Sequence, residues 1–248
     1  MKSITTLTLA LTSFLFYLNV DTSEIREVGS FDGIEISGNF EVELYKGQEG
    51  QIELTGAADQ LQNIITEVEN NQLKIRIKKG RYLKWWKLSK VYIKIPVEEI
   101  NSCGFSGSGL IKSRDVLSAE FLNLNLSGSA KAYYQIQTDK LNSSISGSGM
   151  IQLTGSTKQS SLNVSGSGSI NAKALSTLQT NAQISGSGRI TVLCSEELDA
   201  SISGSGRIRY SGNPQRISSK VSGSGDISTL YNCLLPIVFE TSPLYLVQ

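Results

Sequence analysis

The stretch ISGSGMI, at residues 145–151, decides the fold because the chain repeats it with little change. Seven copies of its Ser-Gly-Ser-Gly core begin at Ser106, Ser127, Ser146, Ser165, Ser185, Ser203 and Ser222. The copy at Ser127 reads SGSA, and successive copies begin 18 to 21 residues apart. A unit of about 19 residues cannot bury an apolar face by itself, so the copies must stack on one another.

Two columns of apolar residues accompany the repeat. The residue before each copy is Phe105, Leu126, Ile145, Val164, Ile184, Ile202 or Val221. The sixth position, counted from the first serine, is Ile111, Ala132, Ile151, Ile170, Ile190, Ile208 or Ile227. One coil of a parallel β-solenoid has this length, and each coil adds about 4.8 Å along the axis. The sequence therefore predicts an all-β solenoid of about seven coils, with both columns as ladders inside it.

The glycines of the repeat suit a corner that recurs in every coil, because glycine accepts positive φ and close backbone approach. The serines between them can hydrogen bond along the stack or to water. A phosphate-binding loop is disfavoured, since no Gly-x-Gly-x-x-Gly opens a helix and no Lys-Ser/Thr follows. Calcium is disfavoured as well, because only Asp226 follows a tetrapeptide with a carboxylate, whereas calcium-binding β-rolls repeat one in every turn.

Composition excludes several classes of protein. The chain has 248 residues, 39% of them hydrophobic, which is enough for a continuous core. Its net charge of +1 gives no general attraction to nucleic acid, and it has no histidine, the commonest general base and transition-metal ligand. Cys103, Cys194 and Cys233 form no C-x-x-C pair, so we expect buried single thiols. We predict no catalytic residue, no metal and no cofactor.

Residues 28–100 predict a β-rich part that continues or caps the solenoid. In NFEVELY, QLKIRIKK and VYIKI, apolar and charged residues alternate as in half-buried strands. ENNQ at 69–72 predicts a hairpin or bend, and residues 59–66 fit a helical turn or a strand equally well. Acidic residues gather between Asp21 and Glu69 and basic ones between Lys74 and Lys94, so we expect cross-strand ion pairs worth about 0.2 to 1 kcal/mol each.

One segment of this part has the composition of a ligand site. GRYLKWWKLSK interleaves aromatic and cationic side chains, which can stack on sugar rings, bases or lipid head groups. The same side chains can fold over an open end of the solenoid, and this capping role is favoured. If the chain binds a ligand through this segment, the candidate residues are Tyr82, Lys84, Trp85, Trp86 and Lys87.

Both ends of the chain fall outside the repeat. Residues 1–22 begin MKSITTLTLALTSFLFYLNV, one lysine followed by an apolar run, which predicts an export signal that is removed or an N-terminal anchor that is kept. The repeat-bearing solenoid is expected over 101–227. Residues 228–248 include the apolar stretch YNCLLPIVFETSPLYLVQ, for which a cap, a contact surface and a poorly ordered end remain open.

The ordered series FDGIEISGNFEVELYKG, VENNQLKIRIKKG and VYIKIPVEEI, running into the SGSG repeats, resembles the auto-transporter adhesin head GIN domain family. The resemblance covers about Val28 to Ile227. It implies a right-handed parallel β-helix without established catalytic activity, and family members are mostly envelope or secreted proteins of Bacteroidetes-type bacteria. It supplies no ligand residues.

We therefore expect a non-enzymatic secreted or envelope protein, located in the periplasm, on the outer-membrane surface or outside the cell. It would act as an adhesin or as a protein or glycan contact module. Its partner would be a cell-surface protein or glycan and not nucleic acid, with membrane contact only through the N-terminal segment. The sequence does not decide whether the chain forms homo-oligomers. A polysaccharide-acting enzyme is one alternative, although Glu196, Glu197 and Asp199 are the only acidic cluster in the repeats. A self-assembling scaffold is the other.

Overall fold

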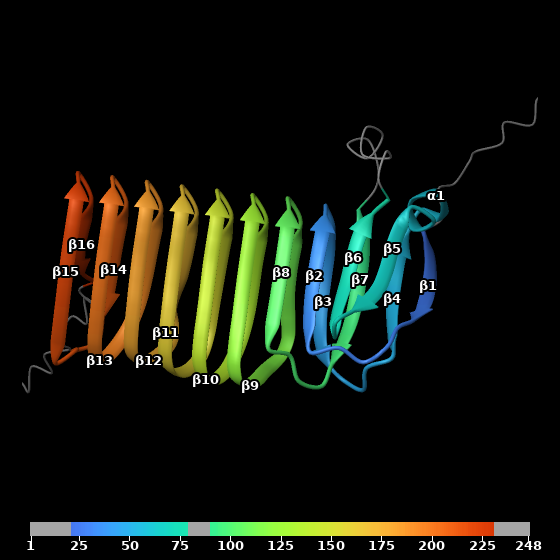
Figure 1. Cartoon of the computed structure of the whole chain (residues 1–248), viewed down its shortest axis with the longest axis horizontal. Helices are drawn as coiled ribbons and strands as arrows, with labels where there is room; N and C mark the ends of the chain where they lie inside the picture. Colours follow the sequence, from blue (N-terminus) through green and yellow to red (C-terminus); the bar gives the residue numbers. More distant parts are fainter. Residues whose placement is uncertain (1–20, 79–89, 231–248) are drawn as a thin grey trace, which may run out of the picture.

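The computed structural model describes residues 21–78 and 90–230, which form an elongated stack of β-coils (Figure 1). The N-terminal elements are β1 (Thr22–Glu27), β2 (Gly33–Gly38), β3 (Phe40–Lys46), β4 (Gln51–Gly56), α1 (Ala58–Leu61), β5 (Ile64–Glu69), β6 (Gln72–Ile77), β7 (Val91–Val97) and β8 (Ser102–Gly107). The coils are β9 (Leu110–Gly128), β10 (Lys131–Gly147), β11 (Met150–Gly166), β12 (Ser169–Gly186), β13 (Arg189–Gly204), β14 (Arg207–Ser211), β15 (Arg216–Gly223) and β16 (Asp226–Thr229). Within the described ranges, no helix has the length and apolar character that crossing a membrane requires.

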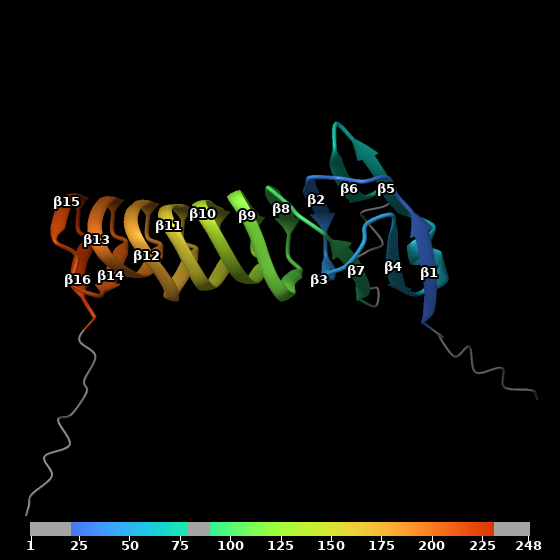
Figure 2. The ribbon, with the colours of Figure 1, turned by 90° about the horizontal axis from the view of Figure 1, so that it is seen from below.

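The coils pair in parallel and in register, which confirms the predicted β-solenoid. Ile151 pairs with Ile170, and Ile170 pairs with Ile190 in the next coil. All three side chains are buried, as are most members of both predicted apolar columns. Each coil is long enough to contribute two walls, because β9 pairs with β3 through its first residues and with β8 through its last. The core is the space between these walls (Figure 2).

The two glycines of each tetrapeptide are required for different reasons. The first has positive φ, +113° at Gly166, and a Cβ there would lie 2.7 Å from the carbonyl oxygen of Gly147 in the preceding coil. A Cβ on the second glycine, Gly168, would lie 2.6 Å from Cγ2 of Ile145. The backbone thus demands the first glycine, and the packing of the apolar column demands the second.

The variant copy SGSA keeps a regular corner. Ser148 N donates to Gly128 O at 2.9 Å, and Met150 N donates to Ala130 O at 3.0 Å. The corresponding bonds in the next coil, from Ser167 and Ser169, are 3.0 Å long. Ala130 is fully buried, so its methyl group adds to the core without changing the hydrogen bonding of the corner.

A second corner is held by a buried threonine column that no repeated motif marks in the sequence. Thr138, Thr157 and Thr177 lie in register, and Cys194 continues the column. Thr157 Oγ1 lies 3.3 Å from the carbonyl oxygen of Asp139 in the preceding coil and 3.0 Å from that of Gln159. Cys194 Sγ makes the equivalent contacts at 3.2 and 3.0 Å. These side chains satisfy carbonyl groups where the chain bends, which a buried corner requires.

The first coil contains an incomplete copy of the repeat. Ser37 and Gly38 of β2 pair with Ser106 and Gly107 of β8, so ISGN at 36–39 occupies the corner position. Phe40 stands where the later copies have their second glycine, which is why the tetrapeptide is not visible in the sequence as an eighth copy. It is fully buried and fills the start of the core.

The turn, the 59–66 segment and the charge pairs of the N-terminal part agree with the sequence patterns. β5 and β6 form an antiparallel hairpin, and Asn70 and Asn71 have φ of 51° and 59°, as a two-residue turn with two positive φ values requires. Residues 59–66 were expected to form a helical turn or a strand, and both occur: the short helix α1 ends at Leu61 and β5 begins at Ile64. The segregated charges pair across strands, with Lys94 Nζ 2.9 Å from Glu53 Oε2 and Lys74 Nζ 2.8 Å from Glu69 Oε2.

Candidate binding groove

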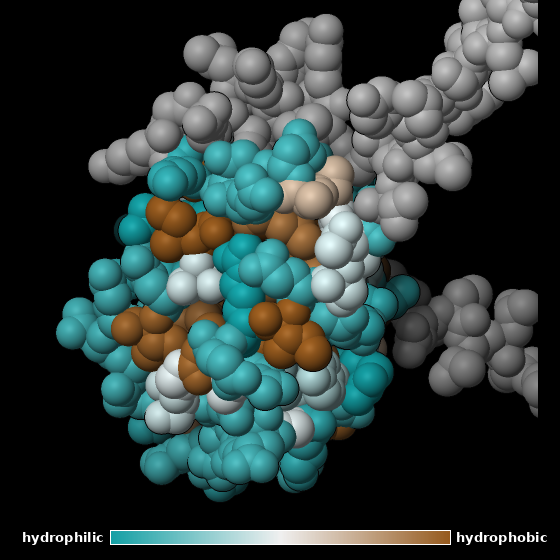
Figure 3. All heavy atoms as spheres, turned by 90° about the vertical axis from the view of Figure 1, so that its right-hand side faces the viewer, coloured by the Kyte–Doolittle hydropathy of each residue, from teal (hydrophilic) through white to brown (hydrophobic). Residues whose placement is uncertain are grey.

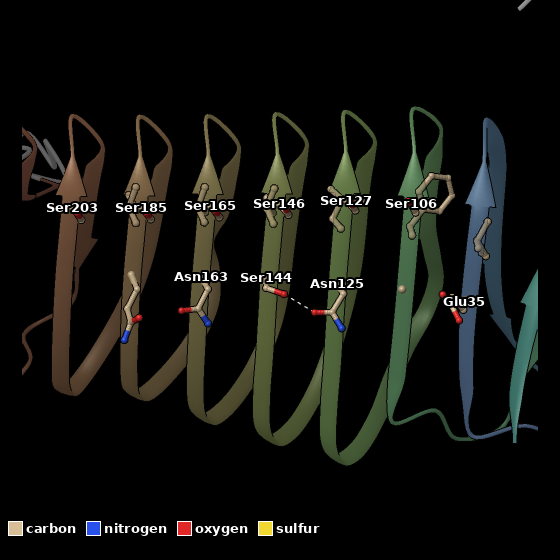
Figure 4. A pocket seen from close by; sticks show the side chains of 18 of the residues that line it. Glu35, Ser106, Asn125, Ser127, Ser144, Ser146, Asn163, Ser165, Ser185 and Ser203 are labelled. Carbon is tan, nitrogen blue, oxygen red and sulfur yellow. Dashed lines mark hydrogen bonds between the residues drawn. The ribbon is translucent and has the colours of Figure 1, made fainter. Parts of the chain in front are cut away.

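A groove of about 570 Å³ runs along the outer face of one wall, over the strand segments that precede the tetrapeptides (Figure 4). It crosses β2, β8 and the last residues of β9 to β13. One row of outward side chains, the serine column, consists of Ser106, Ser127, Ser146, Ser165, Ser185 and Ser203. The neighbouring row, the amide column, consists of Glu35, Gly104, Asn125, Ser144, Asn163, Gln183 and Ser201.

The groove follows from strand alternation and coil register. Ile145 is 2% exposed and points into the core, so the side chains of Ser144 and Ser146 on either side of it point outward. The coils are in register, with Ser146 paired to Ser127 and to Ser165, so residues of one type align along the axis. Because serine is small, these rows leave a hollow in the wall.

Hydrogen bonds within the groove leave most of its polar groups available. Ser144 Oγ donates to Asn125 Oδ1 at 2.5 Å, and Asn163 Nδ2 donates at 3.3 Å to Ser161 Oγ, which lies outside the groove lining. Within the described residues, the hydroxyl groups of the serine column are exposed and make no hydrogen bond to another side chain. They can therefore donate to and accept from a ligand or water.

The lining of the groove is almost uncharged. Among the described residues that line it, Glu35, at the end nearest the N-terminal strands, is the only ionisable side chain. The described residues hold no group of three or more His, Cys, Asp or Glu side chains that could bind a metal ion. The described lining therefore combines neutral hydrogen-bond donors and acceptors with apolar residues of the wall, among them Leu126, Ile145 and Val164.

The sequence-predicted site residues fall in a part of the chain that the structure does not describe. Tyr82, Lys84, Trp85, Trp86 and Lys87 lie outside the described residues, as do residues 1–20 and Cys233.

The acidic cluster of the repeats lies outside the lining of the groove. Glu197 is paired with Arg216, and Glu197 and Asp199 line a different hollow on the outer face. Sequence reasoning missed the groove itself, because it treated the serines as corner residues only. The signal was present, since the first serine directly follows an apolar residue in every copy and strand alternation turns it outward.

Cys103 and Tyr134 form a buried pair in the core. Cys103 Sγ lies 3.4 Å from Tyr134 Oη, and the sulfur and hydroxyl group are enclosed by the walls. Burial raises the pKa of the Cys103 thiol to about 11, and burial also raises the pKa of Tyr134 well above its ordinary value. A thiol that stays protonated is a poor nucleophile, so this pair stabilises the core and does not form a reactive site.

This pair predicts a loss of stability in alkali. Above pH 9 the unfolded chain loses the Cys103 proton and the folded chain keeps it, so the free energy of unfolding falls until pH 11, by about 2 kcal/mol between pH 8 and 10.5. Urea unfolding at the two pH values should show this loss. Cys103→Ala should lower stability at both pH values and reduce the difference between them; an unchanged difference would show that the thiol does not contribute.

Comparisons with known proteins agree with this architecture. The family model described as "Putative auto-transporter adhesin, head GIN domain" matches residues 30–214. A solved structure of a "putative adhesin" from Bacteroides fragilis has a TM-score of 0.79 and 24% identity, and the match covers 85% of this chain and 97% of that one. A "putative lipid binding protein" from Parabacteroides distasonis has a TM-score of 0.69 and 26% identity over 85% and 97% of the two chains. No curated protein matches the sequence.

Proposed function

This chain belongs to the auto-transporter adhesin head GIN domain family, and we propose that it is an exported, non-enzymatic contact module that binds an uncharged glycan chain along the groove. The observation that carries the proposal is the alignment of the serine and amide columns over successive coils. The family description and the adhesin names of the structural relatives fit a contact role.

The chemistry of the two columns matches that of sugar hydroxyl groups. Serine hydroxyls and asparagine or glutamine amides both donate and accept hydrogen bonds, as sugar hydroxyls do. Because equivalent side chains recur about every 4.8 Å along the axis, an extended polymer would meet similar groups on each coil. Weak contacts on many coils would then add up along one chain.

The charge and backbone of the groove disfavour other ligands. A polyanion would find no cation among the described lining residues and would approach Glu35. An extended peptide usually adds to the free edge of a sheet, but the groove lies on the face of a wall whose backbone groups are already paired between coils. A neutral, hydroxyl-rich polymer fits these constraints best.

The same lining disfavours catalysis on a polysaccharide. Glycoside hydrolysis requires a pair of positioned carboxyl groups, and the described lining of the groove has one carboxylate, Glu35. We therefore assign binding without turnover. An adhesin role also requires contact with the surroundings, so we place the protein on the outer-membrane surface or outside the cell.

The test fills the groove with large side chains. Ser146→Arg combined with Ser165→Arg places two long side chains in adjacent coils of the serine column, and the matched control is Gln137→Arg with Ser156→Arg, an exposed pair in the same two coils that lies outside the groove lining. Binding is measured against dextran, mannan and a soluble β-glucan, with alginate as a polyanion. We expect the native protein and the control to bind at least one neutral polymer and the groove variant to bind it at least tenfold more weakly.

Three other outcomes would change the assignment. If no neutral polymer binds, or if the groove variant binds as well as the control, the proposal is wrong. Binding to phosphatidylcholine vesicles that the groove variant loses would favour a lipid, the ligand class for which the Parabacteroides distasonis protein is named. If Trp85→Ala with Trp86→Ala abolishes glycan binding while the groove variant does not, the aromatic segment is the contact site.

A further inference from the structure

The last coil leaves the interior of the solenoid uncovered. Ile217 and Val221 of β15 continue the inward columns of Leu198 and Ile202, with which they pair. Leu198 and Ile202 are 0% and 1% exposed, but Ile217 is 45% and Val221 is 43% exposed. Two residues that face the core by register therefore face solvent because no described coil follows them.

The backbone of this coil is open as well. Among the described strands, β15 pairs only with β13 and β16 pairs only with β14. The outer edges of β15 and β16 therefore present unpaired N–H and C=O groups next to apolar side chains, an arrangement that promotes edge-to-edge association unless it is covered.

The opposite end of the molecule is more polar. Seen from that end, the surface is mostly hydrophilic and its apolar residues lie in separate patches (Figure 3). There the helix α1 and the antiparallel strands replace the parallel coils, and Leu61 of α1 is 2% exposed. The C-terminal end has no such cover among residues 90–230.

We propose that residues 231–248 of this chain cap the last coil by packing on Ile217 and Val221 and pairing with the edge of β15. The segment is 18 residues long, equal to β12, and 11 of its residues are apolar while only Glu240 is charged. It starts at the open end, because Leu230 N donates to Tyr210 O at 2.6 Å and holds the chain there.

Two features favour this segment over a second copy of the chain. A segment that is tethered at the site has an effective concentration in the millimolar range, which a second molecule at ordinary concentration does not reach. The segment also contains Pro236 and Pro243, which lack an N–H group, so a strand formed by it would end the ladder instead of extending it. A cap of this kind protects the apolar end from further stacking.

The test uses the full chain with Cys233→Ser and Val247→Cys, because a label on Cys233, three residues beyond Leu230, would lie near the last coil whether or not the segment docks. Cys103 and Cys194 are buried, so a nitroxide reagent applied to the folded protein should attach at position 247. We expect the nitroxide to broaden the methyl NMR signals of Ile217 and Val221 at least fivefold more than that of Ile34 at the other end. If their broadening is no greater than that of Ile34, the proposal is wrong.

Two controls distinguish the occupants of this end. In the first, protein that carries the nitroxide but no isotope label is mixed with isotope-labelled protein that carries no nitroxide. Broadening of the Ile217 signal in this mixture would show that a second copy of the chain, and not residues 231–248 of the same chain, covers the last coil. Val221→Ser should reduce the broadening of Ile217, whereas Val116→Ser, at a position that is 48% exposed away from this end, should leave it unchanged. Equal effects of the two variants would contradict docking on Val221.

Discussion

Replacing Gly166 with alanine is expected to lower the free energy of unfolding by about 3 kcal/mol or more. Two costs add at this position. The residue has φ of +113°, which L side chains rarely adopt, and the new Cβ would lie 2.7 Å from the carbonyl oxygen of Gly147. Neither atom can move away easily, because both belong to corners fixed by the coils on each side. Denaturant unfolding followed by circular dichroism measures the effect.

Gly50 separates the two costs. It has φ of +120°, but an added Cβ would have nothing within 4 Å. Gly50→Ala should therefore cost only the backbone strain, about 1 to 2 kcal/mol. If Gly50→Ala and Gly166→Ala are equally destabilising, the close approach between successive corners contributes nothing, and the stacked corner is not the reason for the first glycine.

Replacing Ile170 with alanine is expected to cost about 3 to 4 kcal/mol, because it removes a fully buried side chain from the centre of a ladder. Ile170 lies between Ile151 and Ile190, so the cavity would be bounded by residues that the hydrogen-bonded coils hold in place. Thermal and denaturant unfolding both report the change. Ile25→Ala is the control, since Ile25 is 65% exposed, and it should change stability by less than about 0.5 kcal/mol.

A result below about 1 kcal/mol for Ile170→Ala would contradict this account of the core. It would mean that the wall beside Ile170 collapses into the space, or that the interior is loosely packed. Neither behaviour fits a ladder in which each residue is covered by the one above and the one below.

Much of the fold could be predicted from the repeat alone. The spacing of the tetrapeptides fixed the coil length, and the two apolar columns identified which residues stack. The reason is physical: a residue that recurs once per coil always meets its own copies, so the sequence period and the structural period are the same. The half-buried strands of the first part were also predictable, because Phe40, Val42 and Leu44 alternate with charged neighbours.

The features that could not be predicted from the sequence do not recur as one residue type at the spacing of the coils. The corner at Ser37 and Gly38 is incomplete, because Phe40 replaces the second glycine, so the copy does not match the others. The threonine column ends in Cys194, and that cysteine makes the same contacts as Thr157 although it differs in type. Only the pairing of the coils brings such residues into one column.

The groove could have been predicted in part. Its serine column is visible in the sequence, and strand alternation places those side chains outside. The amide column varies in type from coil to coil, as in Asn125, Ser144 and Gln183, so no motif marks it. The hollow between the columns depends on side-chain size over several coils, which is a property of the folded wall.

The central claim is that equivalent residues of successive coils lie on top of one another. Methyl NOE measurements on isoleucine-labelled protein test it most directly. The account predicts cross-peaks between Ile151 and Ile170 and between Ile170 and Ile190, with none directly between Ile151 and Ile190. The absence of the first two cross-peaks, or a direct one between Ile151 and Ile190, would contradict it.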